Sequence, residues 1–110
     1  MIKMGRKTIA EKLLGELPKA DSFEKTMLVL YDFSKRKAPG DFYNNLKRIT
    51  EATEDGASMV QYSVYRTTSM KAAIAVGRLA ARYGAETVLY EVTETSPDRL
   101  TEQLEAAQEV

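Results

Sequence analysis

Asp32 is the residue whose type and position best suit chemistry. It interrupts the apolar run Met-Leu-Val-Leu-Tyr-Asp-Phe at residues 27–33, close to the C-terminal end of an expected strand. In a sheet with helical crossovers, polar side chains at strand ends emerge into a crevice. A carboxylate there can bind a divalent cation, which polarises a phosphate or activates a water. The structural alternative is a turn cap that accepts hydrogen bonds from backbone amides near Ser34, and spacing alone favours this alternative.

Three successive cations, Lys35, Arg36 and Lys37, follow Ser34 directly. Cations beside a carboxylate can hold a nucleic-acid backbone while the carboxylate keeps a metal. Arg66 ends a second candidate strand segment, and we expect it to add a further cation at the same edge. Short charge runs are also ordinary features of solvated loops. The whole chain carries 16 basic and 16 acidic residues, so its net charge argues neither for nor against nucleic acid.

Four aromatic residues fall in the candidate strands: Tyr31, Phe33, Tyr62 and Tyr65. Such residues can stack on bases, as in ferredoxin-like RNA-binding sheets. More often they pack in a core or a dimer interface, which is the interpretation we favour. The basic-Gly-aromatic-Gly signature of RNA-binding sheets is absent from the sequence, as is a glycine-rich phosphate loop.

The chain contains no cysteine and no histidine. Disulfides, thiolate nucleophiles, nitrogen- or sulfur-ligated zinc and the commonest general base are therefore excluded. A metal site in this chain would have oxygen ligands, which favours Mg²⁺ or Mn²⁺.

Periodicity and capping signals predict four helices and three or four strands. Apolar spacing predicts helices over residues 8–17, 41–53, 69–83 and 96–109, with Thr8 and Glu11 as a capping box and Gly84 as a C-terminal stop. Strands are expected over residues 27–33 and 87–92, the first of them covered on both faces. Residues 58–68 form either one bent strand or two short ones, and the pattern does not choose between them.

Without the two terminal helices, the order strand, helix, strand, helix, strand predicts an α+β fold with a ferredoxin-like (split βαβ) sheet and helices on one face. The 110 residues suit a single domain, with a helical extension over residues 1–26, a core over 27–93 and a C-terminal helix over 96–109. The other sheet face should be partly apolar, so we expect a homodimer with Tyr62 and Val64 in its interface.

The location of the protein follows from hydropathy. No apolar run approaches the roughly 20 residues that a membrane span needs. Residues 1–25 are charged throughout and lack the apolar stretch of a signal peptide. We therefore expect a cytoplasmic protein without membrane contact.

Two segments together resemble a known family. Leu-Val-Leu-Tyr-Asp-Phe-Ser at residues 28–34 resembles the first strand of the CRISPR-associated Cas-two family, the smaller core protein of spacer acquisition. Val-Gln-Tyr-Ser-Val-Tyr at residues 60–65 resembles that family's Gln-x-Ser-Val-aromatic segment, and the intervening helix and glycine-containing turn also match. The similarity covers about residues 27–92.

The resemblance implies a symmetric ferredoxin-like homodimer that binds nucleic acid, with the CRISPR integrase as a partner protein. It makes Asp32 the catalytic, metal-binding aspartate of a Mg²⁺- or Mn²⁺-dependent endonuclease acting on RNA or DNA, with one metal shared across the dimer axis. Ser34 and the basic loop would lie beside it, and residues 61–65 would line the interface.

A different class of function remains open. The chain can instead be a non-catalytic interaction or dimerisation module on the same ferredoxin-like fold. Its terminal helices would then dock a partner or a second subunit. Each carries an apolar stripe for this purpose: Ile9, Leu13 and Leu17 in the first helix, and Leu100 and Leu104 in the last.

Overall fold

The structure, a computed structural model, describes residues 7–34, 37–53, 58–61 and 63–109. The described part is an α+β arrangement of four strands and four helices. In chain order the elements are α1 (Ile9–Gly15), β1 (Thr26–Asp32), α2 (Gly40–Thr53), β2 (Ser58–Gln61), β3 (Val64–Thr67), α3 (Met70–Arg82), β4 (Glu86–Val92) and α4 (Pro97–Gln108).

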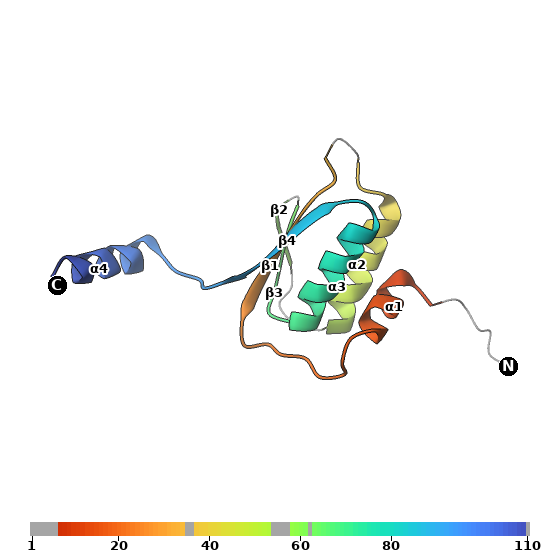
Figure 1. Ribbon diagram of the computed structural model, residues 1–110, viewed down its shortest axis with the longest axis horizontal. Coiled ribbons are helices and arrows are strands. Elements are labelled where there is room, and N and C mark those ends of the chain that lie inside the picture. The colour runs from red at the N-terminus through yellow and green to blue at the C-terminus, as the bar shows by residue number, and fades with distance from the viewer. Residues whose placement is uncertain (1–6, 35–36, 54–57, 62, 110) are drawn as a thin grey trace.

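The strands form one antiparallel sheet in the order β2-β3-β1-β4. Helices α2 and α3 lie side by side on one face of this sheet, and α1 packs on their far side (Figure 1). The core therefore has three layers, which are the sheet, the α2–α3 pair and α1. Helix α4 stands apart from these layers at the end of β4 (Figure 1).

The central strand β1 is buried on one face only. Val29 and Tyr31 point into the helical layer and are almost fully buried, whereas Leu28 and Leu30 on the other face are half-buried. The expectation that this strand is covered on both faces is wrong. The apolar run is continuous because the outward residues are also apolar, although no helix of the described chain covers them.

The segment over residues 58–68 forms two strands rather than one bent strand. β2 and β3 pair antiparallel, with an irregular register between Met59 and Gln61. A bulge of this kind bends and twists the strand that carries it. Both strands have only four residues, so the β2–β3 hairpin is shorter than the β1–β4 pair on the other side of the sheet.

Caps confirm the predicted starts of α1, α3 and α4, whereas α1 ends at Gly15, two residues before the predicted end. Thr8 and Glu11 form the capping box of α1. The Ser69 hydroxyl accepts a hydrogen bond from the Ala72 amide at the start of α3. After α3 the backbone reverses at Gly84 with φ of 93°, a conformation that a side chain would disfavour.

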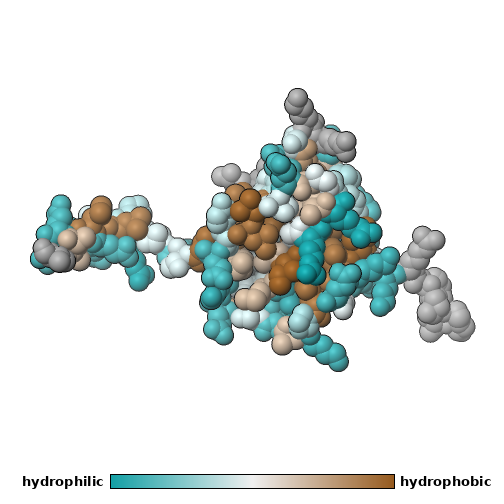
Figure 2. Space-filling model, in the orientation of Figure 1, coloured by the Kyte–Doolittle hydropathy of each residue, from teal (hydrophilic) through white to brown (hydrophobic). Residues whose placement is uncertain are grey.

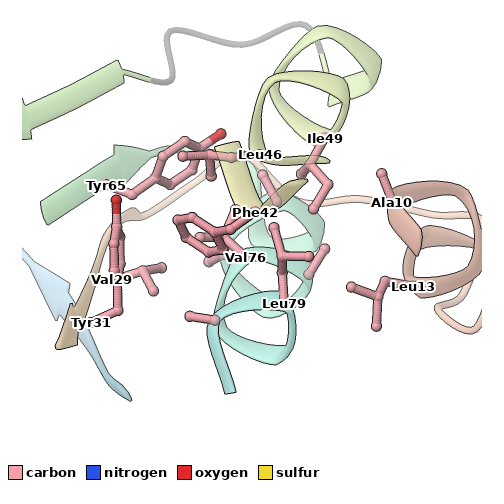
Figure 3. Packing of buried hydrophobic residues seen from close by; sticks show 14 of the residues in the cluster. Ala10, Leu13, Val29, Tyr31, Phe42, Leu46, Ile49, Tyr65, Val76 and Leu79 are labelled. Atoms are coloured by element: carbon pink, nitrogen blue, oxygen red, sulfur yellow. The ribbon is translucent and has the colours of Figure 1, made fainter. Parts of the chain in front are cut away.

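Helix α3 is buried around most of its circumference, because it contacts the sheet, α2 and α1. Val76 and Leu79 are fully buried among residues from three layers (Figure 3), whereas Met70 and Ala81 near the two ends of the helix are exposed. Gly77 brings α3 close to β4, since a Cβ there would lie 3.0 Å from Leu89 Cδ1.

A buried asparagine fastens α1 to α2. The Asn45 side chain accepts a hydrogen bond from the Ala10 amide and donates one to the Asp41 carbonyl, each at 2.9 Å. Leu13 of α1 belongs to the buried hydrophobic core (Figure 3). The apolar stripe of α1 therefore packs against the core of its own chain.

Within the described ranges, no helix combines the length and the apolar character needed to cross a bilayer.

Candidate metal and nucleic-acid site

Asp32 is the last residue of β1, and its side chain is exposed. Asp32 Oδ1 accepts a hydrogen bond from the Ser34 amide at 2.7 Å. Ser34 has a φ of 59°, the left-handed conformation that is uncommon for residues other than glycine. The carboxylate therefore stabilises the turn, as the structural alternative predicted. The bond occupies Oδ1, which leaves Oδ2 able to take a further ligand.

A second carboxylate lies directly opposite Asp32 on the neighbouring strand β4. Glu86 begins β4 and is the register partner of Asp32 in the β1–β4 pair. Paired residues in antiparallel strands project on the same face, about 5 Å apart at Cβ. The sequence alone did not place Glu86 in the site, because its position beside Asp32 depends on which strand pairs with β1 and in which register.

The two carboxylates edge a shallow hollow of about 310 Å³. It opens at the end of the sheet where β1 leaves and β4 enters. The lining residues are Leu30, Tyr31, Asp32, Ser63, Val64, Glu86 and Val88.

The loop cations can be placed only in part. Ser34 and Lys37 are exposed just beyond Asp32. Lys35 and Arg36 lie outside the described residues. Among the described loop residues, Ser34 lies next to Asp32 through the hydrogen bond from its amide.

Arg66 does not join this group, so the expectation that it lies at the same edge is wrong. Because β3 runs antiparallel to β1, Arg66 pairs with Leu28, which stands four residues before Asp32. At about 3.3 Å per residue, this position is roughly 13 Å from the carboxylate end. The Arg66 guanidinium lies 3.6 Å from the Glu94 carboxylate at the other end of the sheet.

The aromatic residues of the strands mostly serve the core. Tyr31 and Tyr65 are buried, and the Tyr65 hydroxyl lies 2.7 Å from Thr50 Oγ1. Tyr31 and Phe33 each pack edge-to-face on Phe42, with ring centroids 5.1 Å apart. These residues are therefore not a stacking platform for bases. Tyr62 lies outside the described residues.

Tyr31 is also unsuited to act as a base next to Asp32. Burial raises the pKa of its phenol to about 12, with a smaller contribution from Tyr43. The phenol therefore stays protonated at neutral pH. Its backbone amide donates to the Ser63 carbonyl at 3.0 Å, which connects β1 to the turn before β3.

The uncovered side of the sheet is largely apolar, and we call it the open face. Its apolar residues occupy matching register positions on three strands: Leu28, Leu30, Val64, Val88 and Tyr90. Val88 and Tyr90 are 48% and 51% exposed. Val64, predicted as an interface residue, lies on this face and is half-buried by its neighbours. Tyr90 was missed, although its alternation with Val88 was a usable signal.

The donor set at the carboxylate end suits a hard cation but is incomplete in one chain. Asp32 and Glu86 offer oxygen ligands only, as Mg²⁺ and Mn²⁺ prefer. Among the described residues there is no group of three or more acidic or other metal-ligating side chains. The chain supplies two carboxylates at this point, Asp32 and Glu86.

Comparison with known proteins adds no assignment to this geometry: no protein-family model, curated protein or solved structure matches the chain.

Proposed function

We propose that the chain is a nucleic-acid-binding homodimer with a ferredoxin-like core, related in arrangement to the Cas-two family that its two strand motifs resemble. Two features of the fold support this. The sheet order β2-β3-β1-β4 is the order expected of a split βαβ domain. Both crossovers, through α2 and through α3, lie on the same face of the sheet.

One observation carries the functional part of the proposal: the Asp32–Glu86 pair stands at the end of an uncovered apolar sheet face. Contiguous exposed apolar surface on a small protein usually marks an interface, and two-fold symmetry is its commonest form. Two copies stacked through their open faces, with the axis parallel to the strands, bring like ends of the two sheets together. Such a dimer gathers four carboxylates at one end.

In this assembly, the four carboxylates would hold Mg²⁺ or Mn²⁺. The cation would polarise a phosphate and lower the pKa of a bound water. Asp32 is already positioned by its bond to the Ser34 amide, so little of its side-chain freedom remains to be lost when it binds. Residues 34–37, which follow it in the chain, would hold the nucleic-acid backbone, and Arg66 would reach a phosphate further along the strand.

The binding part of the proposal is tested by the salt dependence of affinity for labelled DNA and RNA. Replacing Lys35, Arg36 and Lys37 with alanine should reduce the slope of log K against log salt by about two to three, at 0.7–0.9 for each phosphate contact. A control triple variant removes three exposed cations of α1 and α2, which are Lys12, Lys47 and Arg48. Equal slopes for the two triple variants would contradict binding through the loop.

The catalytic part is tested separately by hydrolysis of RNA and DNA in Mg²⁺ or Mn²⁺. Asp32→Ala and Glu86→Ala should each remove the activity of the wild-type dimer. If wild type and both variants hydrolyse nothing while salt-dependent binding persists, the endonuclease activity is refuted and binding remains.

A second candidate function is a non-catalytic interaction or dimerisation module. The specific observation in its favour is that Asp32 already has a structural role at the turn. This function predicts a dimer whose mass is unaffected by Asp32→Ala, with no hydrolysis and no salt-dependent binding of nucleic acid.

A further inference from the structure

Helix α4 is well formed although it stands apart from the three core layers. The Ser96 hydroxyl accepts a hydrogen bond from the Arg99 amide at 3.2 Å, and Pro97 occupies the first turn. No residue of α4 is buried, and Leu100 and Leu104 are 48% and 70% exposed. An isolated helix of 12 residues is marginal in water even with good caps. The helix therefore needs a surface to cover its apolar side.

The spacing of the apolar residues in α4 is that of a coiled-coil seam. Pro97, Leu100, Leu104 and Ala107 recur at intervals of three, four and three residues, which is the a/d pattern of a heptad. The space-filling view shows apolar and hydrophilic side chains side by side along this helix (Figure 2).

The charges of α4 are placed away from that seam. At 3.6 residues per turn, all its carboxylates fall on the opposite side of the helix: Asp98, Glu102, Glu105 and Glu109. The positions that flank the seam are the uncharged Thr101, Gln103 and Gln108. Two such helices can therefore pair without bringing like charges together, although each is acidic.

The chain that leads to α4 directs it away from its own open face. Residues 93–96 continue β4 without a turn (Figure 1). Ser96 is extended, with φ of −142° and ψ of 160°, and the following Pro97 disfavours a helical reversal at that residue. The Glu94 carboxylate lies 3.6 Å from the Arg66 guanidinium in an exposed ion pair at this end of the sheet.

We propose that α4 pairs in parallel with α4 of a second copy, so that the dimer has a second contact beyond the sheets. This inference rests on the proposed homodimer. β4 runs from Glu86 at the carboxylate end to Val92 at the opposite end. An axis parallel to the strands that joins the carboxylate ends therefore makes both copies of α4 leave at the same end. The stacked sheets hold the two helices at high effective concentration, which compensates for a seam of fewer than two heptads.

Introduced cysteines test this pairing, because the chain has no cysteine of its own. Ala107→Cys lies on the seam, and Glu102→Cys, on the opposite side of the same helix, is the matched control. Under mild oxidation at micromolar concentration, Ala107→Cys should form a disulfide-linked dimer about tenfold faster than Glu102→Cys or more, since only facing positions approach within bonding distance. Adding Leu104→Glu to Ala107→Cys should remove this advantage.

Sedimentation of the unmodified chain distinguishes a failure of the α4 pair from a failure of the homodimer. A dimer in which Ala107→Cys and Glu102→Cys cross-link equally slowly overturns the α4 pair and leaves the homodimer intact. A wild-type monomer at micromolar concentration overturns the homodimer and the α4 pair with it.

Discussion

Replacing Asp32 with asparagine distinguishes a metal ligand from a turn cap. Asparagine retains Oδ1, so it can still accept the hydrogen bond from the Ser34 amide that the carboxylate accepts at 2.7 Å. It removes one negative charge opposite Glu86. The substitution therefore changes the electrostatics of the site while it preserves the acceptor that the turn requires.

Without metal, two opposing changes in the free energy of unfolding should nearly cancel. Like charges directly opposite on paired strands destabilise a sheet by about 0.2–1 kcal/mol, and Asp32→Asn relieves this repulsion. The exposed bond to the Ser34 amide loses its charge assistance, which costs at most about 1 kcal/mol. We expect a net change within about 0.5 kcal/mol of zero. If only the turn mattered, Asp32→Asn would destabilise the protein.

With metal, the two proteins should separate widely. A ligand at 100 times its Kd that binds only the folded state stabilises it by about 2.7 kcal/mol. For a domain of this size, each kcal/mol shifts the midpoint by about 4–8 °C, so saturating Mn²⁺ should raise the wild-type Tm by roughly 10–20 °C. Asp32→Asn should show little of this shift, because each chain loses one of its two ligand carboxylates.

Thermal unfolding followed by circular dichroism, with and without millimolar Mn²⁺, measures both effects. Glu51→Gln is the matched control, since it removes an exposed carboxylate of α2 from the far side of the molecule. Its response to Mn²⁺ should equal that of the wild type. A wild-type dimer whose Tm is indifferent to millimolar Mn²⁺ would refute a metal at Asp32.

Two further predictions concern buried polar contacts. Asn45→Ala leaves the Ala10 amide without its acceptor between α1 and α2, and should lower the free energy of unfolding by about 1–3 kcal/mol, measured by urea denaturation. Burial alone would raise the pKa of Asp21, but hydrogen bonds from the Ser69 hydroxyl and the amides of Lys71 and Ser22 outweigh it and lower the pKa. Because the folded state binds this proton less tightly than the unfolded state, Asp21 stabilises the fold above its ordinary pKa of 3.8 and loses this contribution as the pH falls below it. Asp21→Asn should therefore flatten the acid limb of the stability curve, and an unchanged limb would contradict the assignment.

The local elements of this protein follow from short-range rules. Thr8, Ser69 and Ser96 mark helix starts because their hydroxyls accept hydrogen bonds from backbone amides of the first turn. Gly84 marks a helix end because it adopts a positive φ that a side chain would disfavour. These effects act within three or four residues, so they can be recognised in the sequence alone. The same holds for the turn role of Asp32, which depends on a residue two positions away.

The composition of the site depends instead on contacts between distant segments. Glu86 lies beside Asp32 only because β4 pairs with β1 in one register, and Arg66 is distant because β3 runs the opposite way. Tyr31 and Tyr65 became core residues because both helices cover the same face of the sheet. The sequence pattern is compatible with several registers and with either face, since a strand with apolar residues on both sides can bury either one. Packing of α3 against the sheet selects one face, and the open face and its carboxylate end result from that selection.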